Sequence, residues 1–358
     1  MKSSIKILTS VIGYGTYFPA LLVKKKLESL GFEVELFIFE RLYSQEKKKL
    51  FYESAEAFAT NFKLARLANK VPVDYHASTD VAQVKDLYGK WSKDKSIHFL
   101  CFSGLWFEVL KNYAPNVTKV KISCCRMDAG NAHTWVNRSH LDIDNMYYMF
   151  DVTSRSINYR FEVPSFVSLP YNERKNEVII HGGGWGLGDF IKSTQGIVSK
   201  GYHRNIVIRN SEDYNSGEVG TTFFMNDPHW DILCYPNREE SFPSIGKITE
   251  GEVTDYADND KYHPILDLVN TSKAIISKPG GMTLADSLIS CTPMFYLEPL
   301  GENEIGNSVI IDMLKIGMSF KNWEKEGFNP RYLSLFHENL KILKRKTPDF
   351  VLSYLKKN

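Results

Sequence analysis

Residues 274–307 constrain the fold of this chain more than any other segment. They begin with an apolar run, Ala274–Ser277, whose length suits a strand buried on both faces. Gly280 and Gly281 follow, and because neither has a Cβ atom, they allow the backbone to turn sharply. A helical pattern and a second apolar run, opened by Pro293, complete the segment. This order predicts a strand, a turn, a helix and a strand of a parallel α/β sheet.

Apolar runs alternate with helical patterns along the rest of the chain, which is typical of parallel sheets with crossover helices. A length of 358 residues exceeds one ordinary core, so we expect two domains. The polar, proline-containing residues 168–176 interrupt the pattern and indicate a linker, after which the plan of strand, glycine loop and helix starts again. We therefore predict an α/β protein with two similar domains, residues 1–170 and 171–329, followed by amphipathic helices over residues 330–358.

The same periodicity places individual elements along the chain. The strands that we expect are residues 5–8, 33–39, 97–102, 120–125, 146–150, 157–163, 177–180 and 205–208. The helices that we expect are residues 19–30, 42–67 and 190–199.

Composition narrows the class of protein. A net charge of +2 gives no reason to expect a nucleic-acid partner. The lysine runs at residues 24–26 and 47–49 are typical of solvated helix faces, and the alternative is contact with an anionic membrane surface. No apolar run is long enough to cross a bilayer, and the five cysteines form no Cys-x-x-Cys pair. We therefore expect a cytoplasmic protein, with a peripheral contact to the inner face of the membrane as the alternative. No histidine spacing indicates a metal site.

The turn at Gly280 and Gly281 is the first candidate site. A helix that begins near Thr283 would direct free N–H groups and the positive end of its dipole at this turn, which suits a diphosphate. Asp286 lies three residues after Thr283. In one interpretation Thr283 caps the helix and Asp286 completes a capping box, which the spacing alone favours. In the other, Asp286 binds a ribose diol through two hydrogen bonds.

A polar loop after Pro299 is the second candidate site. Glu302, Asn303, Glu304 and Asn307 follow closely on one another there. Alone, they would indicate an ordinary surface loop. Because the loop directly follows the strand after the glycine turn, we expect it to bind hydroxyl groups of a sugar.

The glycine-rich residues 181–188 are the third candidate site. Gly183 and Gly184 lie between a predicted strand and a predicted helix, where backbone amides can contact a phosphate. The loop fits neither Gly-x-Gly-x-x-Gly nor the P-loop pattern, so neither a dinucleotide fold nor a P-loop is indicated. His181 ends the strand and is interpreted as bracing the loop, with a catalytic role as the rival.

The second half of the chain resembles the nucleotide-sugar-binding domain of GT-B glycosyltransferases, in particular the group of the bacterial peptidoglycan N-acetylglucosaminyltransferase and the diacylglycerol glycosyltransferases. The residues that match the pattern of this family are Lys278-Pro279-Gly280-Gly281, Thr283-Leu284, Asp286, Pro293, Glu304 and Asn307. The family usually has Glu where this chain has Asp286, which has a shorter reach. In the first half, residues 13–20 resemble the opening glycine loop of the family and its Phe-Pro-Ala helix start.

This resemblance implies two Rossmann-like domains that face each other across a cleft, with the C-terminal helix packed back on the first domain. It implies a nucleoside-diphosphate sugar as co-substrate, a UDP-sugar above others, and no cofactor or metal. The acceptor would be a hydroxyl or amine of a small molecule, lipid or glycan, and transfer would invert the anomeric centre. The implied donor contacts are Gly15, Gly183, Gly184, Gly280, Gly281, Met282, Thr283, Asp286, Glu302, Asn303, Glu304 and Asn307.

The catalytic base is where the chain departs from the family. Many inverting members have a histidine in the opening loop, where this chain has Thr16 or Tyr17. Asp128 and His133, on the loop after the strand at residues 120–125, are the candidates that we expect to face the cleft. Two alternatives stay open: a nucleotide-sugar hydrolase or 2-epimerase, and a subunit that binds nucleotide sugars without turnover.

Overall fold

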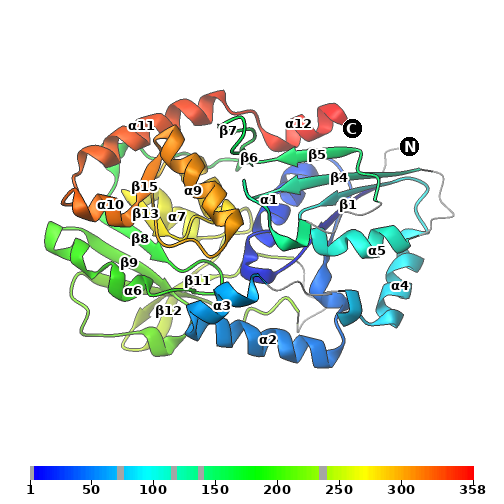
Figure 1. Ribbon diagram of the computed structural model, residues 1–358, viewed down its shortest axis with the longest axis horizontal. Coiled ribbons are helices and arrows are strands. Elements are labelled where there is room, and N and C mark those ends of the chain that lie inside the picture. The colour runs from blue at the N-terminus through cyan, green and yellow to red at the C-terminus, as the bar shows by residue number, and fades with distance from the viewer. Residues whose placement is uncertain (1–3, 71–75, 114–118, 136–140, 234–239) are drawn as a thin grey trace.

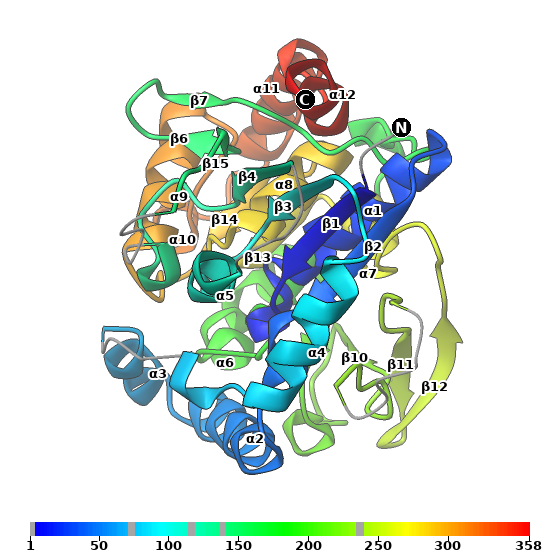
Figure 2. The ribbon, with the colours of Figure 1, turned by 90° about the vertical axis from the view of Figure 1, so that its right-hand side faces the viewer.

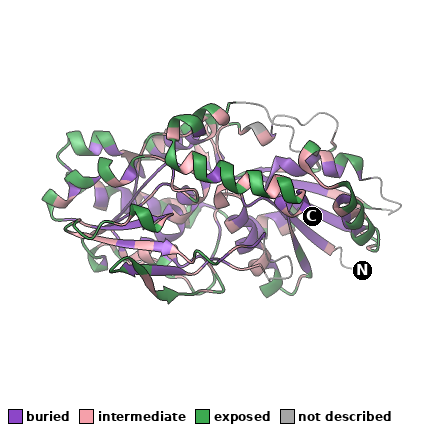
Figure 3. Ribbon diagram, turned by 90° about the horizontal axis from the view of Figure 1, so that it is seen from below, coloured by how far each residue is buried: buried purple, intermediate pink, exposed green. Residues whose placement is uncertain are grey.

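A computed structural model describes residues 4–70, 76–113, 119–135, 141–233 and 240–358. The chain forms two α/β domains that lie side by side (Figure 1). Their strands are largely buried, and the covering helices expose their outer faces (Figure 3). The prediction of an α/β fold with two Rossmann-like domains is confirmed.

The first domain is built on a parallel five-stranded sheet of order β2-β1-β3-β4-β5. Its strands are β1 (Ser4–Thr9), β2 (Val34–Ile38), β3 (Ile97–Cys101), β4 (Val120–Arg126) and β5 (Asn145–Tyr148). Its helices are α1 (Tyr17–Ser29), α2 (Gln45–Thr60), α3 (Phe62–Ala68), α4 (Val81–Trp91) and α5 (Phe107–Asn112). All five residues of β3 are buried, as expected for a central strand with helices on both faces (Figure 2).

The second domain contains an eight-stranded sheet of order β12-β11-β10-β9-β8-β13-β14-β15. Its parallel strands are β8 (Glu177–His181), β9 (His203–Ile208), β10 (Thr221–Asn226), β13 (Ala274–Ser277), β14 (Met294–Tyr296) and β15 (Gly317–Ser319). β11 (Ile245–Thr249) and β12 (Glu252–Ala257) extend one edge in antiparallel fashion. Its helices are α6 (Phe190–Ser193), α7 (Ile265–Thr271), α8 (Gly281–Ser290), α9 (Glu302–Leu314) and α10 (Phe320–Lys325).

Two C-terminal helices divide between the domains (Figure 1). α11 (Arg331–Lys346) packs on the second domain, where the His337 Nδ1–H group donates to the Cys291 carbonyl at 2.8 Å. α12 (Phe350–Lys357) packs on the first sheet, where the Tyr354 hydroxyl hydrogen-bonds to His98 Nδ1 at 2.9 Å. The chain therefore crosses between the domains a second time, just before Phe350.

Three predicted elements differ from the structure. The strand expected at residues 157–163 is wrong: β6 (Phe150–Asp151) and β7 (Ser156–Ile157) form a short hairpin. The extended chain after this hairpin pairs with the segment that joins α11 to α12, where the Phe350 amide donates to the Arg160 carbonyl. The helix at 42–67 divides at Asn61, whose side chain caps α3. The helix at 190–199 becomes α6 and a 3-10 helix, Gln195–Lys200.

The lysine run at residues 24–26 lies on α1, with two of its side chains in ion pairs. Lys24 pairs with Glu28 at 3.1 Å, and Lys26 pairs with Glu162 at 3.8 Å. In the described part of the chain, no helix combines the length and the apolar character that crossing a membrane requires.

Candidate functional site

The N-terminus of α8 is the centre of the site. The helix begins at Gly281, two residues earlier than predicted, and Gly280 is its N-cap without a side-chain cap. The capping-box interpretation is therefore wrong, because Thr283 and Asp286 both lie inside the helix. Gly281 is suited to this position because a Cβ atom there would lie 2.3 Å from the Met127 carbonyl oxygen of the first domain. The two domains thus make close backbone contact at this turn.

The carboxylate of Asp128 occupies the end of α8. Asp128 lies on the loop after β4 and is half-buried. Its Oδ1 accepts from the Gly281 amide at 3.0 Å and from Asn307 Nδ2 at 2.8 Å. Its Oδ2 accepts from Asn303 Nδ2 at 3.0 Å. An anionic oxygen at the first turn of a helix is favoured by the helix dipole and by the free N–H groups there.

The polar loop predicted after Pro299 is instead the start of α9, which corrects that prediction. Gly301 is its N-cap, and Glu302, Asn303 and Glu304 lie in its first turn. Acidic side chains are favourable there because they face the positive end of the helix dipole. Pro299 and Gly301 indicate a loop in the sequence, but the loop ends at Gly301.

Asn307 joins three segments through its side-chain amide. Its Nδ2 group donates to the Pro279 carbonyl at 2.8 Å as well as to Asp128. Its Oδ1 accepts from the Ala129 amide of the first domain at 2.8 Å. Asn307 is fully buried. It therefore connects the glycine turn, α9 and the loop after β4.

Lys278 adds a cation beside this turn. Its Nζ lies 3.5 Å from Glu304 Oε1, and both side chains are less than a tenth exposed. A Cβ atom on Gly183 would lie 3.5 Å from the same Nζ, so the ammonium group is also next to the glycine loop. Lys278 belongs to the motif that resembles the family, but it was not predicted as a contact. Its position directly after a buried strand, at the carboxyl edge of the sheet, was the available signal.

The glycine loop is braced by His181. Its Nδ1 accepts from the Gly183 amide at 3.2 Å and lies 3.3 Å from Ser277 Oγ. Burial, with a smaller effect from the Lys278 charge, lowers the pKa of His181 to about 4, so the imidazole is neutral at pH 7. This geometry supports the bracing interpretation.

The glycine loops of the two domains touch each other. A Cβ atom on Gly184 would lie 2.3 Å from the Gly13 carbonyl oxygen. A Cβ atom on Gly15 would meet nothing within 4 Å among the described residues. Gly184 is therefore needed for close approach, whereas Gly15 has open space beside it.

Aromatic side chains join the domains next to these loops. The Phe18 ring at the start of α1 stacks on His263 of the second domain, with centroids 4.7 Å apart. Tyr14 contacts Trp230 edge-on at 5.7 Å. Phe58 of α2 packs on Trp185 of the glycine loop at 5.9 Å. The two faces of the site are therefore in extensive contact.

Asp286 lies one turn into α8 and is half-buried. Burial raises the pKa of its carboxyl group to about 8. No residue in the described ranges donates a hydrogen bond to this carboxyl group. Of its neighbours in the helix, Thr283 is buried and Met282 is half-buried. A half-buried carboxyl group to which no described residue donates is a candidate for contact with a ligand.

The predicted bases have different surroundings. Asp128 is hydrogen-bonded at α8 as described above, and the side chain of His133 lies outside the described residues. Thr16 and Tyr17 are the two residues of the opening loop that could correspond to the histidine of inverting glycosyltransferases, and both use their hydroxyl groups internally. Thr16 donates to the Ser10 carbonyl at 2.8 Å, and Tyr17 donates to the Ser241 carbonyl at 3.0 Å.

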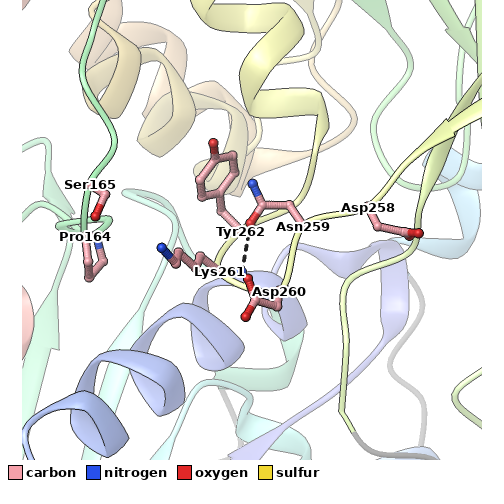
Figure 4. Close-up of a pocket in the computed structure, with 7 residues that line it drawn as sticks. All are labelled: Pro164, Ser165, Asp258, Asn259, Asp260, Lys261 and Tyr262. Carbon is pink, nitrogen blue, oxygen red and sulfur yellow. Dashed lines mark hydrogen bonds between the residues drawn. The ribbon is translucent and has the colours of Figure 1, made fainter.

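A surface pocket lies apart from these residues (Figure 4). It is lined by Pro164 and Ser165 of the chain between β7 and β8 and by residues 258–262 of the loop before α7, and by none of the predicted donor contacts. Within the ranges that the structure describes, no three His, Cys, Asp or Glu side chains converge as ligands for a metal ion.

The sequence matches no protein-family model and no curated protein. The fold, however, is similar to solved glycosyltransferases over nearly the whole chain. The spinosyn rhamnosyltransferase SpnG shares 9% identity, with 99% of each chain covered and a TM-score of 0.57. SsfS6 of Streptomyces sp. SF2575, complexed with thymidine diphosphate, shares 9% identity over 99% of this chain and 100% of that chain, with a TM-score of 0.56. SnogD from Streptomyces nogalater shares 10% identity over 99% and 98%, with a TM-score of 0.53. The chain therefore has the two-domain fold of the GT-B glycosyltransferases.

Proposed function

We propose that this protein is a glycosyltransferase that moves a sugar from a nucleoside-diphosphate sugar, specifically a UDP-sugar, to an acceptor hydroxyl or amine. One observation carries the proposal: a backbone amide and two side-chain amides donate to the two oxygens of the Asp128 carboxylate at the first turn of α8, with the Lys278 ammonium group nearby. Such a set of donors suits a diphosphate. The likeness of the fold to glycosyltransferases, including one complexed with thymidine diphosphate, supports it.

The donor contacts follow from this placement. The diphosphate binds to the amides of Gly281, Met282 and Thr283 and to Lys278. The glycine loops, through Gly15, Gly183 and Gly184, and the turn at Gly280 permit close backbone approach to it. The carboxyl group of Asp286 binds the ribose. Glu302, Asn303, Glu304 and Asn307 bind the sugar and orient the adjoining phosphate.

The transfer is a displacement at the anomeric carbon. The acceptor oxygen or nitrogen forms a bond to this carbon while the bond to the phosphate oxygen breaks, which inverts the centre. The proton of the acceptor passes to a base, for which Asp128 is the first candidate and His133 the second. The developing negative charge on the leaving UDP is stabilised by Lys278 and the α8 amides, so no metal ion is required. Activity should therefore be unchanged by EDTA.

Binding of UDP and TDP, measured by calorimetry, tests the proposal. Replacing Lys278 by Met removes the ammonium group beside the turn, and we expect a loss of UDP affinity of about 10- to 100-fold, the usual range for one charge-assisted contact. Lys273→Met is the matched control, since the Lys273 ammonium group contacts Asn176 of the linker and the Tyr171 ring and none of the predicted donor contacts among the described residues. If neither nucleotide binds the unaltered protein, or if both variants behave alike, the assignment of the site is wrong.

The internal use of the Thr16 and Tyr17 hydroxyl groups favours one second candidate, a subunit that binds nucleotide sugars without turnover. Product analysis separates the possibilities. A UDP-sugar incubated without acceptor yields free sugar if the protein is a hydrolase, and a new epimer if it is a 2-epimerase. Binding of UDP without any product across a broad set of acceptors would favour the non-catalytic subunit.

A further inference from the structure

We propose that residues 127–130 of the first domain are an internal plug of the donor diphosphate site, with the Asp128 carboxylate in the place of a phosphate. The donor then binds only after this segment withdraws. The inference rests on the proposed function, because it assumes that the first turn of α8 binds the diphosphate.

The groups that bind Asp128 are ones that can also bind a phosphate. The Gly281 amide and the Asn303 and Asn307 side-chain amides all donate to Asp128, at 2.8–3.0 Å. These N–H groups would donate to phosphate oxygens as well as to carboxylate oxygens. Two anions cannot accept from the same N–H groups at once, so Asp128 and a donor diphosphate compete.

The two domains lie too close together at this turn to leave room for a phosphate. A Cβ atom on Gly281 would lie 2.3 Å from the Met127 carbonyl oxygen. One on Gly306 would lie 2.6 Å from the Gly130 amide nitrogen, and one on Gly130 would lie 2.2 Å from the Glu302 carbonyl oxygen. Contacts this close leave no room for a methyl group. A phosphate group is larger, so it cannot enter at this face while residues 127–130 stay in place.

The plug is held in place by polar bonds that a diphosphate can replace. Besides the three bonds to Asp128, the Ala129 amide donates to Asn307 Oδ1 at 2.8 Å. These bonds are polar and run from the plug to groups assigned to the donor. A diphosphate brings more negative charge than a single carboxylate, and Lys278 is already beside the turn. The donor can therefore replace the carboxylate, while residues 127–130 keep the two domains in contact at this turn until it does.

The closed arrangement reduces the measured affinity for the donor. When a closed form outweighs the open form about tenfold, the apparent dissociation constant rises by about the same factor. Asp128→Ala removes the internal anion, and we therefore expect it to bind UDP about tenfold more tightly than the unaltered protein. Asp142→Ala is the control, since Asp142 is an exposed carboxylate of the same domain and its removal changes the net charge equally.

Calorimetry with UDP on the three proteins tests the plug. Tighter binding by Asp128→Ala alone, or binding by Asp128→Ala where the unaltered protein shows none, supports it. Equal or weaker binding by Asp128→Ala overturns the plug and leaves the proposed function standing. If none of the three proteins binds UDP or TDP, the proposed function fails, and the plug fails with it.

Hydrogen exchange on the unaltered protein gives a second test that needs no variant. On saturation with UDP, the amides of Ala129 and Gly130 should exchange faster, because the plug leaves its site. The amides of residues 281–283 should exchange more slowly. Slower exchange at both segments would mean that residues 127–130 close over the donor, which would overturn the proposal.

Discussion

Replacing Arg174, near the end of the linker, should lower the free energy of unfolding by an amount that its buried hydrogen bonds determine. Its guanidinium group is buried and donates to the Leu169 carbonyl, to the Ser272 carbonyl at 3.0 Å, and to Ser290 and Thr292. Burial lowers the pKa of Arg174 to about 10, which still leaves it charged at pH 7. The guanidinium group thus ties the linker to the C-terminal end of α8.

Arg174→Met keeps most of the apolar stem and removes the donors. Three backbone carbonyls lose a partner, and at about 1 to 1.5 kcal/mol for each buried acceptor the loss is about 3 to 4.5 kcal/mol. Improved burial of the apolar side chain returns about 1 kcal/mol. We therefore expect the free energy of unfolding to fall by about 2 to 3.5 kcal/mol.

Urea unfolding, followed by circular dichroism, measures this loss as a shift in midpoint at constant slope. Lys175→Met is the matched control, because the Lys175 side chain is exposed and its one contact among the described residues is a 4.0 Å ion pair with Glu177. The control should change stability by less than about 0.5 kcal/mol. A loss below about 1 kcal/mol for Arg174→Met would show that the carbonyls find other partners, and would refute the reasoning.

Three further predictions concern the site and the domain contacts. The pKa of Asp286, about 8, means that the native state keeps a proton which the unfolded state releases above pH 4, so stability falls as pH rises from 4 to 8. The free energy of unfolding of Asp286→Asn should therefore exceed that of the unaltered protein by about 1 to 2 kcal/mol at pH 8, and the two values should converge near pH 4. Stability curves that stay parallel between pH 4 and pH 8 would contradict this. Gly184→Ala forces the two glycine loops apart and should cost about 1 to 3 kcal/mol in thermal unfolding, while Gly15→Ala, with open space around it, should cost less than 1 kcal/mol; equal costs would exclude the steric explanation. Tyr354→Phe removes the hydrogen bond to His98 that helps dock α12, and should cost about 1 kcal/mol and speed exchange of the α12 amides; unchanged exchange would mean that ring packing alone holds the helix.

Local patterns were enough to find much of the fold. The strand at Ala274–Ser277, the glycine turn and the helix after it were all predicted, because burial on both faces and conformational freedom at glycine are properties of a few adjacent residues. Boundaries were less well predicted. The start of α8 was placed at Thr283 because a side-chain cap is visible in sequence, whereas the actual cap, Gly280, has no side chain.

Contacts between distant residues could not be read from the chain. Asp128 and Asn307 are 179 positions apart, and their hydrogen bond exists only because the loop after β4 meets the ends of α8 and α9 across the two domains. The same holds for Lys278 and Glu304, and for the apolar residues near Arg160, which pair with the chain before α12 instead of joining a sheet.

The sequence by itself determined the alternation of strands and helices, the division into two α/β halves and the glycine turns, since each depends on short-range periodicity and backbone freedom. Only the tertiary structure decided that an aspartate of one domain faces the first turn of a helix of the other. That pairing depends on how two separately folded sheets are brought together, and no local propensity encodes it.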